Sequence, residues 1–166
     1  MTQTVTGFSE LKSGQDLCAR CGIPVDSKYF DESSITGLPP SGREVVLARF
    51  ELPPQYCGVL EYFAQFTNLL ATNPGEIETD GVEWALLSNG RPLAPYLPFG
   101  RILNPWGFCS FQLSLRLDAS STTELVVRNR AYEPEAGKPS IARVGGRIVG
   151  RYWYDAAYGD VGRGRH

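Results

Sequence analysis

This sequence of 166 residues contains a single histidine, His166, which is its last residue. Ser-His-Asp and Cys-His arrangements need an imidazole held beside the nucleophile, so both are close to excluded. The chain also lacks the glycine patterns that cradle a nucleotide phosphate or a dinucleotide. We therefore expect a protein that is not an enzyme, with no catalytic and no cofactor-binding residue.

An excess of basic charge is missing as well. The 16 Lys and Arg residues face 18 Asp and Glu, and the formal net charge of −2 gives no support for broad nucleic-acid binding. Apolar runs are too short to cross a bilayer. The first residues lack the order of a basic segment followed by an apolar run, so no secretory signal is expected. We expect neither a membrane partner nor sequence-specific recognition of nucleic acid.

The four cysteines are Cys18, Cys21, Cys57 and Cys109. Cys18-Ala-Arg-Cys21 is the sharpest local motif, since a CxxC loop can supply two thiolates to zinc. A structural zinc site needs four ligands, and the sequence has no second CxxC or HxxxH, so Cys57 and Cys109 would have to complete it. A redox dithiol would need a βαβ setting that is absent. We favour reduced, metal-free thiols and predict no metal site, with zinc as the open alternative.

The clearest structural pattern lies in residues 107–129. Cys109, Phe111, Leu113, Leu115 and Leu117 alternate with polar residues, which places the apolar groups on one face of a strand. After a polar turn, residues 124–128 are rich in β-branched types and predict a second strand. We predict that the two form an antiparallel hairpin with one buried face.

Strands are also predicted on either side of this pattern. Residues 44–52 end at two prolines, and residues 58–66 are rich in aromatic residues, although their spacing also fits a helix. Residues 82–88 lead into Asn89-Gly90, a strong signal for a type I′ hairpin turn, and the proline after it confines the return strand to an edge. A last strand is predicted over residues 141–154, bent at its two adjacent glycines.

Eighteen glycines and twelve prolines, well scattered, add to an all-β prediction. We expect an antiparallel, jelly-roll-like β-sandwich over residues 45–154. Residues 1–44 carry much turn chemistry and little periodicity, so they predict an extended N-terminal arm without a core of its own. Residues 155–166 predict a flexible C-terminal tail.

Two further groups of residues could carry binding or chemistry. Glu76, Glu78, Asp80 and Glu83 cluster before a tryptophan and could form a hydrolase pair or a calcium site, but a solvated loop is the favoured interpretation. Residues 147–154 mix arginines with aromatic residues and could stack bases or sugars. For this segment we favour an amphipathic strand with alternate rings buried.

The order of several motifs resembles small β-sandwich virion structural proteins of tailed bacteriophages. The matching runs share spacing and turn chemistry over residues 45–154: Phe50-Glu-Leu-Pro53, Gly58-Val-Leu-Glu-Tyr-Phe63, Trp84-Ala-Leu-Leu-Ser-Asn-Gly90 and Gly150-Arg-Tyr-Trp-Tyr154. The resemblance implies a non-enzymatic structural role, as a capsid decoration or cement protein or a head-neck component that binds other virion proteins, such as major capsid or neck proteins. It also implies location in the virion, with host cytoplasm as the site of assembly.

Two alternatives stay open. One is a ligand-binding sandwich module that recognises a carbohydrate or receptor through aromatic residues such as Tyr96, Trp106 and Trp153; the other is an enzyme or metal-dependent redox protein. Exposed strand edges and the apolar loop 94–106 are costly to leave in water, so we expect a homo-oligomer, with a ring or trimer favoured over a dimer. The arm is expected to become ordered along a neighbouring subunit or a particle surface.

Overall fold

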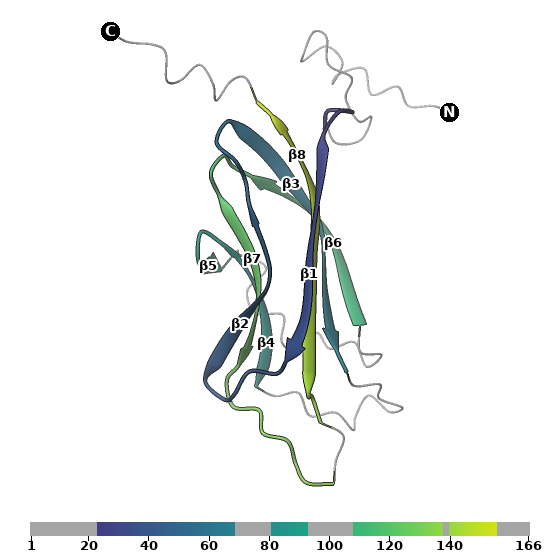
Figure 1. The fold of residues 1–166 in the computed structure, drawn as a ribbon, viewed down its shortest axis with the longest axis vertical. Helices are drawn as coiled ribbons and strands as arrows, with labels where there is room; N and C mark the ends of the chain where they lie inside the picture. The colour runs from purple at the N-terminus through teal and green to yellow at the C-terminus, as the bar shows by residue number, and fades with distance from the viewer. Residues whose placement is uncertain (1–22, 69–80, 93–107, 138–139, 156–166) are drawn as a thin grey trace, which may run out of the picture.

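The computed structural model describes residues 23–68, 81–92, 108–137 and 140–155, which form eight β-strands and no helix (Figure 1). The side chains of residues 108–111 and 113 also lie outside what is described. The strands are β1 (Lys28–Gly37), β2 (Arg43–Glu51), β3 (Tyr56–Thr67), β4 (Val82–Ser88), β5 (Arg91–Pro92), β6 (Phe108–Leu117), β7 (Thr122–Asn129) and β8 (Arg143–Tyr154).

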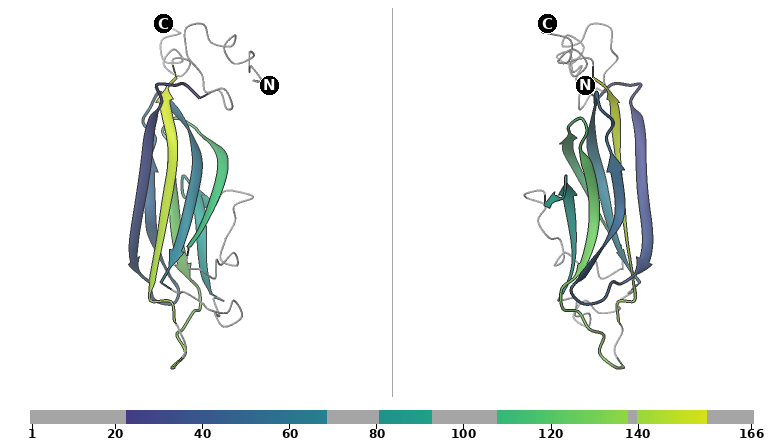
Figure 2. Two further views of the ribbon diagram at one scale, coloured as in Figure 1. Left: turned by 90° about the vertical axis from the view of Figure 1, so that its right-hand side faces the viewer. Right: turned by 60° about the vertical axis from the view of Figure 1, so that its left-hand side comes forward.

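The strands form two four-stranded antiparallel sheets, ordered β1-β8-β3-β6 and β2-β7-β4-β5. In the left view of Figure 2 the sheet β1-β8-β3-β6 lies across the front, with the second sheet behind it. The first strand pairs with the last, the second with the seventh, the third with the sixth and the fourth with the fifth. This nested pairing is that of a jelly roll. The predicted all-β, jelly-roll-like sandwich is therefore confirmed.

The core lies between the two sheets and is built from alternate residues of the longer strands. Trp84 is fully buried, and its Nε1 donates a hydrogen bond of 3.2 Å to the carbonyl oxygen of Gly145 in the opposite sheet. This bond matters because a buried indole N–H without a partner would be costly. Other large side chains in the same core are Leu60, Phe63, Leu86, Leu125, Val127 and Ile148.

Most of the predicted strands are confirmed. Residues 44–52 correspond to β2, residues 58–66 to β3 rather than to a helix, and residues 82–88 to β4. Asn89 and Gly90 have φ angles of 51° and 75°, as a type I′ turn requires, and β5 with its proline is an edge strand. In β6 the alternation holds where side chains are described, because Leu117 is buried and Ser114 is exposed.

The predicted hairpin of residues 107–129 is wrong. β6 and β7 lie in different sheets: β6 pairs with β3, whereas β7 lies between β2 and β4. Alternation defines which face of a strand is buried, and both strands do bury one face. It carries no information about the neighbour in the sheet, and here residues 118–121 cross from one layer to the other.

At Gly145-Gly146, where a bend is predicted, the pairing of β8 with β3 continues without a register shift. The two glycines instead permit close approach. A Cβ atom at Gly146 would lie 2.6 Å from Leu125 Cδ2 in the core, and one at Gly145 would lie 2.9 Å from Ile35 Cγ1 on the outer face. The register shift of this ladder lies at Glu61, between Leu60 and Tyr62.

The predicted boundary of the arm at residue 44 needs correction. β1 occupies Lys28–Gly37, within the predicted arm, and pairs with β8 along its whole length. Its Phe30 is buried in the common core. The polar composition of this segment hid the strand, because a strand at a sheet edge needs few buried side chains. Residues 1–22, including the CxxC motif, and residues 156–166 of the predicted tail lie outside the described part of the chain.

A glycine substitution in β8 tests this packing. Gly150→Ala should lower the free energy of unfolding by about 1–3 kcal/mol, because its Cβ would lie 2.2 Å from the Val59 carbonyl oxygen and 2.5 Å from Phe30 Cζ. Gly37→Ala is the matched control and should be nearly neutral, since its Cβ would meet nothing closer than 3.9 Å. Urea unfolding measures both, and equal effects would contradict the packing.

Candidate interaction site

Of the four sheet edges in the described sandwich, three are interrupted. β2 carries an extra residue between the pairs Val46–Val126 and Ala48–Leu125. β6 is irregular where it faces Leu60 and Tyr62 of β3. β5 consists of Arg91–Pro92 alone. Bulges, short strands and proline are three of the devices by which proteins keep edges from pairing with other chains, and charged side chains are another.

The fourth edge, β1, carries charged side chains but no bulge or proline, and it is not short. Its ten residues contain no proline and pair with β8 in unbroken register from Lys28–Tyr152 to Gly37–Arg143. Both views of Figure 2 show it at the margin of its sheet, and no described strand pairs with its other side. Among the described strands, its outer backbone edge therefore has no partner. We call this strand edge, together with its outward side chains, the β1 edge.

The outward side chains of the β1 edge combine apolar surface with a fixed charge pair. Tyr29 and Ile35 are 70% and 54% exposed. Between them, Asp31 accepts two hydrogen bonds from Arg147 of β8, at 2.7 Å from Nε and 2.5 Å from Nη2. These hydrogen bonds, opposed by a smaller desolvation effect, lower the pKa of Asp31, and the same pair raises the pKa of Arg147.

A second arginine supports Tyr29 from the neighbouring strand. The guanidinium of Arg151 lies 5.7 Å from the centroid of the Tyr29 ring, within the range of a cation–π contact. Its Nε also donates to both carboxylate oxygens of Glu61, at 3.1 and 3.0 Å. Glu61 is the extra residue of the β3 bulge, so the bulge aims this carboxylate at β8. The exposed tyrosine is thus held against a positioned cation.

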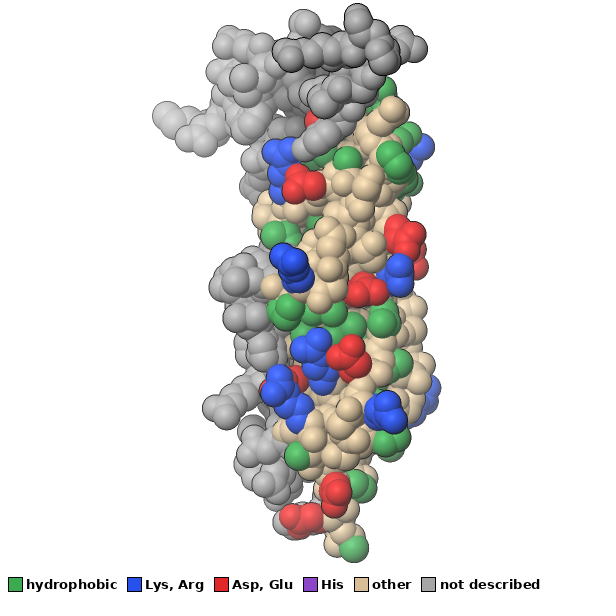
Figure 3. Space-filling model, turned by 90° about the vertical axis from the view of Figure 1, so that its left-hand side faces the viewer, with side chains coloured by type: hydrophobic (Ala, Val, Ile, Leu, Met, Phe, Trp, Pro, Cys, Tyr) green, Lys and Arg blue, Asp and Glu red, His purple; other side chains and the backbone are tan. Residues whose placement is uncertain are grey.

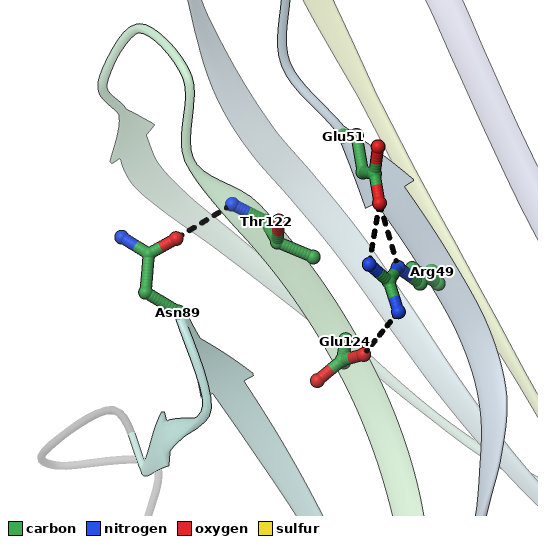
Figure 4. Close-up of polar contacts among 5 residues, drawn as sticks. All are labelled: Arg49, Glu51, Asn89, Thr122 and Glu124. Atoms are coloured by element: carbon green, nitrogen blue, oxygen red, sulfur yellow. Dashed lines mark hydrogen bonds and ion pairs between the residues drawn. The ribbon is translucent and has the colours of Figure 1, made fainter.

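The neighbouring edge strand β2 is closed by paired charges. Arg49 contacts Glu51 of its own strand and lies 3.4 Å from Glu124 of β7 (Figure 4). The close-up also shows Asn89, whose Oδ1 accepts a hydrogen bond of 2.8 Å from the Thr122 backbone N–H and so ties the β4–β5 turn to the start of β7. The Arg49 side chain and the β4–β5 turn thus make their contacts within the sandwich.

The outer face of the β2-β7-β4-β5 sheet continues this pattern. Acidic and basic side chains lie beside one another on it, with hydrophobic groups between them (Figure 3). Besides Arg49, the pairs are Arg128 with Glu44 at 2.7 Å and Arg130 with Glu83 at 2.5 Å. Where this face is described, its charges are paired in this way and form no patch of one sign.

An aromatic cluster fills one end of the sandwich. Phe30 of β1 and Phe50 of β2 stack with centroids 3.9 Å apart and so join the two sheets. Tyr152 contacts Phe50 and Tyr56 at 5.4 and 5.7 Å, and Tyr154, 50% exposed, lies 5.8 Å from Tyr56. The adjacent Gln55 has a φ of 68°, an uncommon conformation for this residue type. This end presents tyrosine rings to solvent.

The residues singled out in the sequence are not brought together. Cys57 is buried, and its Sγ donates a hydrogen bond of 3.5 Å to Asp155 Oδ2. Cys109 belongs to β6, although its side chain is not described, and Cys18 and Cys21 lie outside the described residues. Within the described residues, no group of three His, Cys, Asp or Glu side chains could hold a metal ion.

The other candidates divide in the same way. Trp153 is half-buried, whereas Tyr96 and Trp106 lie outside the described residues, as does the loop that contains them. Glu83 forms its pair with Arg130, while Glu76, Glu78 and Asp80 are not described. In the described chain, no helix has the length and apolar character of a membrane span.

Sequence reasoning missed the residues of the β1 edge. Tyr29, Asp31 and Ile35 fell in a segment assigned to turns because of its serines and acidic residues. The signal that could have found the strand is the pair of β-forming runs at its ends, Tyr29-Phe30 and Ile35-Thr36, with even spacing between Tyr29, Asp31 and Ile35.

No protein-family model matches the chain, and neither does any curated protein. Among solved structures, FlhE is 15% identical with a TM-score of 0.37, and the match covers 78% of this chain and 97% of FlhE. A structure of infectious bursal disease virus, Gt strain, is 10% identical with a TM-score of 0.39 over 84% of this chain and 35% of that one. Dimeric latent PorU from Porphyromonas gingivalis is 11% identical with a TM-score of 0.29, and the match covers 84% of this chain and 14% of PorU.

These scores are all below 0.5, so the three likenesses carry no inference about function. What the described residues define is a class: a jelly-roll β-sandwich with one open strand edge. Its candidate site is the β1 edge, where Asp31 is paired with Arg147 and the Tyr29 ring lies against Arg151.

The Asp31–Arg147 pair should make stability depend on pH. Because the folded state lowers the pKa of Asp31, the pair stabilises above the usual aspartate pKa of about 4, and this contribution is lost as pH falls through the lowered value. Asp31→Asn should therefore be less stable than the wild type at neutral pH, and the two should converge in acid. Urea unfolding at several pH values checks this, and Arg147→Gln should give no further loss in the double variant.

Proposed function

We propose that this protein is a non-enzymatic structural protein of a virion, which decorates, cements or joins parts of a bacteriophage particle by binding other chains. The observation that carries the proposal is the β1 edge, an uninterrupted ten-residue strand open on one side. An open edge offers backbone donors and acceptors to any extended segment that lies along it. Protein–protein association is the function that such an edge serves best.

The outward side chains support the same conclusion. Tyrosine and arginine are enriched where proteins bind one another, and Tyr29, Arg147 and Arg151 lie together on the outer face of β1 and β8. Asp31 and Glu61 neutralise the two arginines, so the surface carries little net charge. A surface of this kind favours a protein partner over a nucleic acid or a charged metabolite.

The fold and the sequence resemblance also support a structural role in a virion. Jelly rolls occur in viral capsid proteins, and also in lectins and cupins, so the fold by itself leaves several functions possible. The resemblance to tailed-phage virion proteins selects among these. On this proposal the partners are other virion proteins and further copies of the chain, assembled in the host cytoplasm.

Isolation of native particles tests this function. In a density gradient of the lysate that produces the protein, the chain should sediment with a large particle, and mass spectrometry should find it in a fixed ratio to the other particle proteins. A chain that sediments only as a small free protein, while particles form without it, would contradict the proposal.

Two truncations separate attachment from folding. Removal of residues 1–22 leaves every described strand in place, so the sandwich should fold and should lose binding to the particle if the predicted arm attaches it. Removal of residues 1–43 also deletes β1 and the buried Phe30, and should be markedly destabilised by the lost core contact. Thermal unfolding and particle co-sedimentation measure the two effects. Undiminished attachment of the shorter truncation would reject the role of the arm.

A second candidate function rests on the aromatic cluster. Tyr154 is half exposed beside Tyr56, and such rings can stack on the faces of sugars. A carbohydrate-binding protein should give reproducible signals on a glycan array, and Tyr154→Ala should remove them while the melting temperature stays near that of the wild type. A blank array would leave the structural role as the one candidate.

A further inference from the structure

The two exposed apolar side chains of the β1 edge are placed symmetrically. Tyr29 and Ile35 lie three positions before and after Glu32. Both lie on the outer face of the sheet: the Tyr29 ring contacts Arg151, and Ile35 Cγ1 lies 2.9 Å from the place of a Cβ on Gly145. A strand with this pattern can match a second copy of itself.

Strand geometry limits how two copies can pair. In an edge strand only every second residue directs its backbone N–H and C=O toward the open side. Two copies can pair only if these residues meet one another, so a two-fold axis between the strands must lie midway between one residue and the same residue of the other copy. With the axis at Glu32, Tyr29 of each copy lies opposite Ile35 of the other. Aromatic and β-branched side chains opposite one another form a favourable cross-strand pair, and this register makes two.

The main opposing effect in this register is the meeting of the two Glu32 side chains. Glu32 is exposed, so water and salt screen this repulsion. Asp31 adds none, because its charge is already neutralised by Arg147 and it would lie opposite Ser33. With the axis at Ser33 instead, Ile35 would lie opposite Asp31, and both apolar pairs would be lost. The register centred on Glu32 therefore buries more of the exposed apolar surface than the register centred on Ser33.

We propose that β1 pairs with β1 of a second copy, antiparallel and centred on Glu32, which joins two four-stranded sheets into one continuous eight-stranded sheet. This inference rests on the proposed function, which includes assembly with further copies of the chain. The contact between two copies would be a closed two-fold pair. A larger assembly would then be built from dimers, in place of the ring or trimer expected from the sequence.

A charge exchange across the two apolar pairs tests the contact. In sedimentation equilibrium of the full chain, the wild type should be a dimer, and Tyr29→Glu and Ile35→Lys should each weaken the dimer at least tenfold. An equimolar mixture of the two variants should recover it. In the mixed dimer one apolar pair is restored, and in the other the introduced glutamate faces the introduced lysine.

Two more variants control for register and for general surface effects. Glu32→Gln should tighten the dimer several-fold, because it removes the like-charge pair at the axis. Ser114→Lys, on the exposed side of β6, should leave the association unchanged. Circular dichroism of each variant shows whether the sandwich remains folded.

The outcomes separate this inference from the proposed function. A wild type that is monomeric at all concentrations, or a mixture no tighter than its components, would overturn the β1 contact even if the chain is found in particles. A tighter Glu32→Gln dimer together with recovery in the mixture would support it even if no particle contains the chain.

Discussion

The distance between the two sheets depends on positions in β8 that have no side chain. Gly146 and Gly150 face inward, and a Cβ atom at either would collide with Leu125 or with Phe30 and the backbone of β3. Their absence of bulk lets Phe30 reach across to stack on Phe50, and lets Trp84 approach β8 closely enough to donate its hydrogen bond to Gly145. The contacts that join the sheets therefore depend on small residues in one central strand.

Because β8 lies between β1 and β3, its placement also determines the outer face. Arg147 and Arg151 point outward from it, and each holds a carboxylate of a neighbouring strand, Asp31 on one side and Glu61 on the other. The same alternation that buries Ile148 in the core presents these arginines to solvent. Core packing and the candidate interaction surface are thus two sides of one strand.

Much of the fold could be predicted from the sequence, because alternation and turn chemistry are local. The strands near residues 44–52, 58–66 and 82–88, the Asn89-Gly90 turn and the buried side of β6 all follow from short-range patterns. Pairing partners are set by tertiary contacts. Nothing local distinguishes a turn that returns within one sheet from the 118–121 segment, which crosses to the other. Glycines placed for close approach likewise look like glycines placed for a bend.

The candidate site was beyond local reasoning for a related reason. β1 buries Phe30 but leaves most of its other side chains exposed, and its stability comes from backbone pairing with a strand more than a hundred residues later in the chain. Tyr29 and Ile35 can be recognised as parts of one surface only after the pairing of β1 with β8 is known.

The position of β1 also has a consequence for the motions of the native state. β1 is the first described strand and is hydrogen-bonded to a described strand on one side only, so its release breaks one described ladder and leaves the order β8-β3-β6 intact. β8 and β3 cannot leave without breaking two. Amide hydrogens of β1 should therefore exchange with solvent through a small local opening, whereas those of β3 should exchange only when most of the sandwich unfolds.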